Sequence, residues 1–292
     1  MSLRIDKITT GRFGNKILQY NSLIQIANKY NTEASCCNFN EAKYFKNIID
    51  NKPIPKAKKK ELLFCKNIID GEILDFENKY YNIDDPACLI HNTFFQVTNK
   101  DPREFLELKE EYKPKFNNDY YHVGIHLRGG DIIKKDGNDG REIHEFNYYK
   151  DSINYVIEKF KDKKIIFYIC TDDKNFESYL ETINYLKKNN LEFKLGNINS
   201  YIHDFGILSE CDILINSSST FCLCAGFLGK KDKFIIHSKN WINKNINHTK
   251  WNNNENGKIL DYSIIEFRHT FDNFWINISK GENKFYKVNI II

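Results

Sequence analysis

The segment at residues 126–131 has the sequence HLRGGD, which combines three polar side chains with two glycines. The guanidinium of Arg128 could hold two phosphate oxygens at once, and Asp131 could orient that guanidinium or accept a proton. His126 alternates with Arg128, so both side chains would point to one side of a strand. A simple strand-end salt bridge between Arg128 and Asp131 would give the same pattern. Only six of the 43 basic residues are Arg, and two of the six, Arg128 and Arg12, fall in such clusters, which favours a binding site.

A second cluster, GRFGN at residues 11–15, lies between a predicted strand and a predicted helix. Glycines at 11 and 14 would let the backbone approach a ligand, and a helix N-terminus favours an anion. The spacing is neither that of a dinucleotide fingerprint nor that of a phosphate-binding loop followed by Lys and Ser or Thr. An ordinary tight turn with Asn15 as the helix cap explains the pattern equally well.

Two adjacent carboxylates, Asp172 and Asp173, follow an apolar run at residues 164–170. They could bind a metal ion, a ribose or a guanine edge. One of them could instead cap the next helix, a role that stabilises a helix by about 1 kcal/mol. The chain contains no Asp-x-Asp sequence, which is the usual metal clamp for nucleotide sugars, so we expect neither a metal ion nor a cofactor.

A run of hydroxyl side chains, NSSSTF at residues 216–221, lies between a predicted strand and a predicted helix. Hydroxyls at a helix start can cap the helix and can also donate to phosphate. Capping alone would need only one of the four hydroxyls.

Strands and helices alternate along the chain, which predicts an α/β protein with doubly wound sheets. Ligands in such folds bind at the carboxyl ends of the strands. The polar segment at residues 113–118 contains the last proline, Pro114, and predicts a boundary between domains 1–118 and 119–292. We expect irregular structure with short helices over residues 41–87, and we assign no elements to the aromatic and Asn-rich tail at 240–292. The predicted strands are 3–9, 33–39, 87–91, 121–127, 164–171, 191–194, 212–216 and 233–237; the predicted helices are 15 onward, 101–111, 147–160, 173–189, 201–211 and 220–228.

Composition excludes several classes of protein. Hydrophobic residues make up 41% of the 292 residues, which is enough for a packed core and excludes a disordered chain. No apolar run reaches the roughly 18 residues of a membrane span, and no signal peptide is visible, so we expect a soluble cytoplasmic protein. The eight Cys, with no CxxC pair, are expected to be free and mostly buried rather than bound to zinc. The net charge of +4 is mild, and we expect no nucleic acid partner.

In order and spacing, these clusters resemble the α1,2-fucosyltransferase family, glycosyltransferase family 11, within the superfamily that also holds α1,6- and protein O-fucosyltransferases. The family motif Gly-x-x-Gly-Asn-Gln-x-x-Gln-Tyr is matched except at Lys16, and His-x-Arg-Arg-Gly-Asp is matched except at Gly129. The segments at residues 94–96, 148–149, 171–173 and 219–221 resemble four further family elements. The matching residues of the two longer motifs are Gly11, Gly14, Asn15, Gln19, Tyr20, His126, Arg128, Gly130 and Asp131.

The resemblance implies a GT-B fold, in which two Rossmann-like domains face a central cleft, with acceptor and donor sides in the first and second domain. It also implies an inverting, metal-independent transfer of L-fucose from GDP-fucose to a hydroxyl of a glycan acceptor, with an α1,2 linkage. By resemblance, Arg128 holds the donor pyrophosphate, and His126 and Asp131 join it as catalytic candidates. The other residues that the resemblance assigns to donor binding are Gly11, Arg12, Gly14, Asn15, Asp172, Asp173, Ser218, Ser219, Thr220 and Phe221.

The chain departs from the family at two places. Gly129 stands where the family has a second Arg, and Cys222-Leu223-Cys224 replaces a Trp-rich stretch. These departures leave two alternatives open: a transferase for another deoxysugar such as rhamnose, and an inactive protein that binds a sugar nucleotide or a glycan. An NAD-dependent oxidoreductase is less favoured, because the chain lacks G-x-G-x-x-G. The animal enzymes' membrane anchor is missing, which indicates a bacterial-type or viral member. Glu142, His144 and Glu145 are further candidates for a general base.

Overall fold

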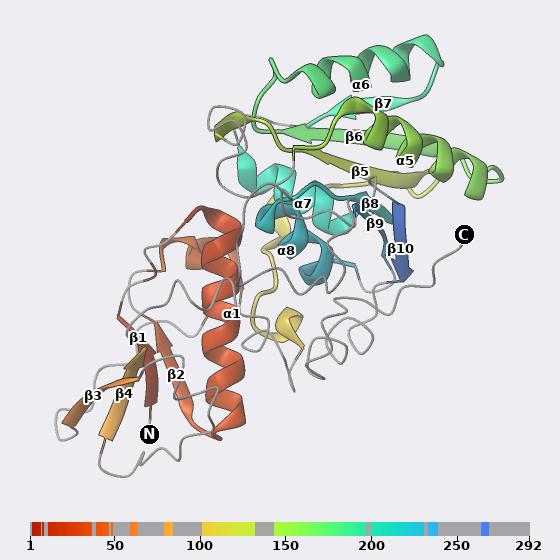
Figure 1. Ribbon diagram of the computed structural model, residues 1–292. Coiled ribbons are helices and arrows are strands. Elements are labelled where there is room, and N and C mark those ends of the chain that lie inside the picture. Colours follow the sequence, from red (N-terminus) through yellow and green to blue (C-terminus); the bar gives the residue numbers. More distant parts are fainter. Residues whose placement is uncertain are drawn as a thin grey trace. The chain divides into compact units, whose positions relative to one another are not determined.

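The computed structural model describes residues 2–6, 8, 11–36, 39–46, 48, 59–63, 79–83, 101–131, 143–196, 200–230, 233–238 and 264–268 (Figure 1). Within these residues the chain divides into two compact units, the first ending at Glu111 and the second beginning at Tyr112. The sequence placed the domain boundary after residue 118. Each unit contains its own sheet, and the α/β class predicted from the sequence is confirmed.

Unit one contains a parallel sheet with the strand order β2-β1-β4-β3. The helix α1 (Phe13–Lys29) connects the first two strands, as the helical spacing of its apolar residues predicts. Leu3, Ile5, Ile17 and Leu23 are fully buried and form part of this unit's core. The strands are β1 (Ser2–Ile5), β2 (Glu33–Cys36), β3 (Lys59–Leu63) and β4 (Lys79–Ile83).

The sequence prediction for the rest of unit one is partly wrong. The strands β3 and β4 lie in the region where we expected only short helices, and the one helical turn described there is η1 (Asn40–Tyr44). The strand β3 begins with two Lys, and β4 is buried continuously from Tyr80 to Ile83, so neither shows the alternation of polar and apolar residues that identifies a strand. The predicted strand at residues 87–91 lies outside the described residues.

The helix predicted at 101–111 is also wrong. The segment forms two short turns, η3 (Pro102–Glu104) and η4 (Glu110–Tyr112). Between them the amide of Lys46 donates to the carbonyl of Glu107 at 2.8 Å, and the amide of Lys109 donates to the carbonyl of Tyr44 at 2.9 Å. These bonds to a neighbouring segment replace the intrahelical bonds that the Asp-Pro start predicted.

Unit two contains a larger sheet with the strand order β10-β9-β8-β5-β6-β7. All neighbours are parallel except β10, which runs antiparallel to β9 and lies in the tail where we assigned no element. The alternation of strands and helices predicted after residue 118 is confirmed. The strands are β5 (Tyr121–Leu127), β6 (Ile165–Thr171), β7 (Phe193–Leu195), β8 (Ile213–Ile215), β9 (Phe234–Ser238) and β10 (Ile264–Arg268), and the helices are α5 (Phe146–Lys159), α6 (Glu177–Lys188), α7 (Tyr201–Glu210) and α8 (Thr220–Leu228).

The helices cover both faces of this sheet (Figure 1). On one face, α5 and α6 share a core with alternate residues of β5 and β6, among them Val123, Ile125 and Phe167. On the other face α7 approaches β5 so closely that a Cβ on Gly124 would lie 3.0 Å from Leu208. Burial on both faces explains why β6 and β8 are nearly continuous apolar runs.

A buried ammonium joins α7 to α8. Lys233 is fully buried, and its Nζ donates to the carbonyls of Leu208 at 2.8 Å, Ser209 at 2.7 Å and Ala225 at 3.1 Å. Burial lowers its pKa to about 8, because the charged form loses its hydration. The contact fixes the two helices beside each other, and α8 carries the hydroxyl run at its start.

Two expectations from composition can be compared with the described residues. Their cysteines, which are Cys36, Cys170, Cys211, Cys222 and Cys224, are all free and buried, as expected. No helix in this part of the chain has the length and apolar character needed to cross a membrane.

Candidate functional site

Three strand ends bring the polar clusters of unit two together. In the parallel pairing of β5 with β6, Leu127 is opposite Thr171, and in the pairing of β5 with β8, Ile125 is opposite Ile215. Because parallel strands end at the same edge of a sheet, the segments that follow these three strands lie side by side. The structure therefore gathers residues 128–131, 172–173 and 216–219 at one edge.

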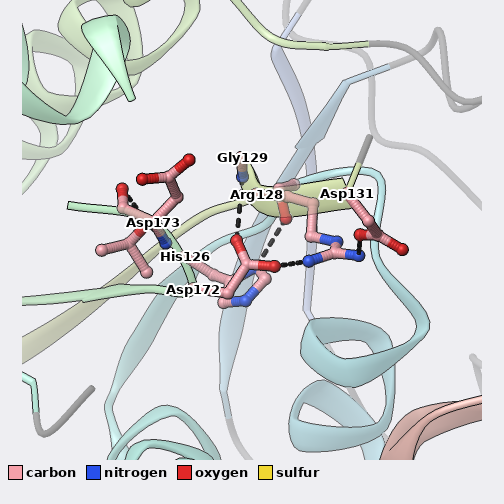
Figure 2. Close-up of polar contacts among 8 residues, drawn as sticks. His126, Arg128, Gly129, Asp131, Asp172 and Asp173 are labelled. Carbon is pink, nitrogen blue, oxygen red and sulfur yellow. Dashed lines mark hydrogen bonds and ion pairs between the residues drawn. The ribbon is translucent and has the colours of Figure 1, made fainter. Parts of the chain in front are cut away.

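Arg128 is the central cation of this edge. Its side chain is only 6% exposed, and both terminal nitrogens are paired: Nη1 with the carboxylate of Asp172 and Nη2 with that of Asp131 (Figure 2). The salt bridge between Arg128 and Asp131 that the spacing suggested is present, and the pair with Asp172 is an addition that the sequence did not predict. The second oxygen of Asp172, Oδ1, accepts the backbone N–H of Gly129 at 3.0 Å.

Neither carboxylate of the Asp-Asp pair caps the next helix, and the capping expected of one of them is wrong. The cap position of α6 is Phe176, which has no side-chain cap bond. Asp173 instead closes a turn, since its Oδ1 accepts the amide of Asn175 at 2.9 Å and its own amide donates to Thr171 Oγ1 at 3.1 Å. The turn places Asp172 toward Arg128 (Figure 2).

The turn before α8 is held by three buried groups. His126 Nδ1 lies 2.5 Å from Ser217 Oγ, and His144 Nε2 lies 3.1 Å from Ser218 Oγ. The hydroxyl of Tyr148 donates to the carbonyl of Asn216 at 2.7 Å. Ser218, which the sequence assigned to donor binding, is thus 1% exposed and bonded to a histidine. These contacts fix the turn from which α8 begins.

The helix α8 begins at Thr220, with Ser219 at the cap position and no side-chain cap bond. A helix start leaves its first backbone N–H groups without intrahelical acceptors, which makes it suited to an anion. Phe221 packs against the imidazole of His126, with 5.5 Å between ring centroids, and against Phe205 at 5.4 Å. His126 therefore connects the end of β5 both to the turn and to the first helical turn.

His144 supports the site without being exposed in it. Its side chain is buried, and burial lowers its pKa to about 4, because the imidazolium would lose its hydration. The ring is therefore neutral at neutral pH, and its centroid lies 4.5 Å from that of the tilted Tyr148 ring. Glu145, another candidate base, is exposed at the cap position of α5, and Glu142 lies outside the described residues.

The residues of the first cluster belong to unit one and form a turn of their own. Gly11 has a φ of +79°, in the left-handed region, and a Cβ there would lie 2.6 Å from the Cβ of Asn15. Arg12 is exposed at the cap position of α1, so the suggestion that Asn15 is the cap is wrong. Gly14 is buried in the first turn. All four residues lie in the turn before α1 or in its first turn, with Gly11 packed against Asn15.

Sequence reasoning missed Asp172 as a partner of Arg128, and it missed His144 and Tyr148 as supports of the hydroxyl turn. The expected pairing of the strands that precede Arg128 and Asp172 could have indicated their contact. No local sequence pattern marks His144 or Tyr148 as a partner of the hydroxyl turn. In the described part of the chain, no group of three or more His, Cys, Asp or Glu side chains is placed to hold a metal ion. Residues 94–96, which resemble a further element of the family, lie outside the described residues.

Comparison with known proteins adds a family and a fold. The family described as "Glycosyl transferase family 11" matches residues 3–258. No curated protein matches the chain. Among solved structures, POFUT1 bound to GDP is 13% identical, with a TM-score of 0.50 over 78% of this chain and 94% of that one. A variant of Arabidopsis thaliana FUT1 bound to GDP is 11% identical, with a TM-score of 0.47 over 81% of this chain and 70% of that one. The likeness to POFUT1 and the two sheets confirm the predicted α/β fold of GT-B type.

Proposed function

Because this chain belongs to glycosyl transferase family 11, we propose that it transfers L-fucose from GDP-fucose to a hydroxyl of a glycan acceptor. In this proposal the transfer inverts the anomeric centre, needs no metal ion and forms an α1,2 linkage. The observation that carries the proposal is the position of Arg128, buried at the carboxyl edge of a parallel sheet and next to the segment that starts α8.

The chemistry of the donor explains this arrangement. When GDP leaves, negative charge develops on the diphosphate, and a site without a metal ion must stabilise it with fixed donors. The guanidinium of Arg128 offers a planar fork for phosphate oxygens, and the start of α8 offers backbone N–H groups. Ser219, Thr220 and Phe221 would line the phosphates or the base.

The nucleotide in the proposal is guanosine diphosphate. POFUT1, whose fold this chain shares, is bound to GDP in the structure described above, and this supports a GDP-linked donor. Asp173, half-buried next to the strand end of β6, would contact the nucleotide. By the family resemblance, the residues of the first cluster, Arg12 and Asn15 among them, would also bind the donor.

Asp131 is our candidate for the general base. Its side chain is 42% exposed, whereas those of His126 and His144 are buried. The acceptor hydroxyl would attack the anomeric carbon of fucose as the bond from that carbon to the diphosphate oxygen breaks. The hydroxyl proton would pass to Asp131. A base must lie within about 3 Å of the proton that it accepts, which an exposed carboxylate can achieve.

The test is a donor titration followed by a transfer assay. Binding of GDP-, UDP- and dTDP-linked sugars is measured by calorimetry, and product is measured across a panel of glycans with terminal galactose and other sugars. We expect GDP-fucose to bind and its fucose to appear in an α1,2 product. Lack of GDP-fucose binding at millimolar concentration would contradict the proposal.

Two other outcomes correspond to the alternatives that Gly129 motivates. Preference for a rhamnose nucleotide over GDP-fucose would reassign the donor. Binding of GDP-fucose without turnover on any acceptor would favour a binding protein.

A further inference from the structure

We propose that Asp172 is a positioning residue for Arg128, and that Gly129 and Gly130 are the surface against which Asp172 is seated. The proposal rests on the proposed function, because the purpose of the positioning is to present Arg128 to the donor diphosphate. It also explains Gly129, where the family has a second Arg. In this chain the space beside that backbone is occupied by residues 172–176.

The register of the sheet creates the pair. Leu127 and Thr171 are opposite each other in the last step of the parallel ladder between β5 and β6. The next residue on each strand is Arg128 and Asp172, so their backbones leave the sheet side by side. Their side chains then meet in an ion pair between Nη1 and Oδ2.

Asp172 is anchored to the backbone as well as to the guanidinium. While Oδ2 pairs with Arg128, Oδ1 accepts the N–H of Gly129 at 3.0 Å (Figure 2). A carboxylate held at both oxygens fixes the plane of the guanidinium relative to the end of β5. Asp131 holds the opposite nitrogen with a side chain that is 42% exposed, compared with 28% for Asp172. Of the two partners of the guanidinium, Asp131 is therefore the more exposed, and in this proposal the phosphate binds on its side.

The two glycines make room for this contact. Gly130 has a φ of +46°, and a Cβ there would lie 2.6 Å from Oδ2 of Asp172. A Cβ on Gly129 would lie 3.0 Å from the Cβ of Phe176 and 3.1 Å from the Cβ of Asp173. Phe176 is buried in the core beneath α5 and α6 and cannot easily retreat.

A side chain at position 129 would therefore push residues 172–176 away from Arg128. Replacing Gly129 by the family's Arg would add a positive charge but would move Asp172. If positioning matters more than the extra charge, the substitution weakens the binding of a diphosphate instead of strengthening it. The two effects have opposite signs, which makes position 129 a sharp test.

The experiment measures GDP affinity by calorimetry in the full-length protein and in four variants: Asp172→Asn, Arg128→Lys, the double variant of these two, and Gly129→Arg. Asn keeps the size of Asp172 and an acceptor for the Gly129 amide. The matched control is Asp162→Asn, an exposed carboxylate in the turn between α5 and β6. Thermal unfolding of each variant shows that it is folded, and Gly129→Ala replaces Gly129→Arg if the latter does not fold.

We expect Asp172→Asn to weaken GDP binding roughly tenfold in the wild-type background and less than about twofold in the Arg128→Lys background, because it acts through the fork that Lys lacks. Gly129→Arg should weaken GDP binding, and Asp162→Asn should leave it unchanged. Equal effects of Asp172→Asn in both backgrounds, tighter binding in Asp172→Asn, or wild-type affinity in Gly129→Arg would each overturn this inference. Failure of the wild-type protein to bind GDP would instead overturn the proposed function on which it rests.

Discussion

His126 Nδ1 lies 2.5 Å from Ser217 Oγ, and this one bond joins the end of β5 to the turn that starts α8. The first of these elements carries Arg128, and the second carries Thr220 and Phe221. Both side chains are buried, so neither can exchange its partner for water. The two parts of the proposed diphosphate site are thus positioned relative to each other by a contact that lies beneath the site.

Removing the Ser217 hydroxyl should destabilise the fold. In Ser217→Ala the ring nitrogen of His126 loses a buried partner, and we expect a loss of about 1–3 kcal/mol in the free energy of unfolding, measured with urea. Ser200→Ala is the matched control, because Ser200 Oγ lies 2.5 Å from His203 Nδ1 in an exposed pair. That variant should change stability by less than about 0.5 kcal/mol. Equal losses in the two variants would show that the buried bond contributes no more to the free energy of unfolding than the exposed one.

His144 should make stability depend on pH between about 4 and 6.5. Its pKa is about 4 in the folded chain and 6.5 when unperturbed, so in this window the unfolded chain binds a proton that the folded chain does not. Stability is therefore present above pH 6.5 and is lost as the pH falls toward 4. The size of this contribution is on the order of 3 kcal/mol.

The measurement is the free energy of unfolding of the wild-type protein minus that of His144→Phe, followed from pH 7 to pH 4. The difference should fall as the pH falls, because the variant lacks this titration. A difference for His144→Phe that does not change with pH would contradict the neutral, buried imidazole.

Asp131→Asn tests the candidate base. The variant keeps the shape of the side chain but cannot take up the acceptor proton, so kcat should fall roughly 100-fold. GDP affinity should change only a few-fold, since Asp172 still holds Arg128. The readout is kcat for fucose transfer beside the Kd for GDP, with Asp162→Asn as the control. A variant with wild-type kcat would remove Asp131 from the proposed role.

Chelation tests the proposed independence from metal ions. The chain has no Asp-x-Asp clamp, and in the proposed function Arg128 with the start of α8 would supply the stabilisation that a metal would otherwise provide. The rate of transfer should therefore be the same in EDTA and in added Mg²⁺ or Mn²⁺. A rate that is lost in EDTA and restored by one of these ions would contradict this part of the proposal.

The sequence was most informative where burial on both faces of a sheet leaves a clear pattern. The run of β6 and the apolar spacing of α5 predicted the order of elements in unit two, and the close spacing of Arg128 and Asp131 suggested their salt bridge. The sequence was least informative where residues that contact each other lie far apart along the chain. The strands β3 and β4 show no alternation of polar and apolar residues, and the backbone of residues 107–109 bonds to residues 44–46.

The same distinction applies to the site. Arg128 and Asp172 are 44 positions apart in the numbering, and only the register of β5 and β6 brings them together. The neutral state of His144 depends on burial by Tyr148 and its neighbours, which no local pattern shows. Position 129 shows the same distinction. The sequence reveals that Gly129 departs from the family motif, but only the structure shows how closely its backbone approaches Phe176.

The most direct test of the central claim is kcat/KM for fucose transfer from GDP-fucose in Arg128→Lys. Lys keeps the charge but loses the two-pronged fork, so kcat/KM should fall by roughly tenfold or more, or about 1.4 kcal/mol. Arg103→Lys is the control, because the Arg103 guanidinium in unit one is also paired at two nitrogens, in this case with the single carboxylate of Asp101. We predict a large loss in Arg128→Lys and none in Arg103→Lys. Full activity in Arg128→Lys would contradict the role of Arg128 in holding the donor.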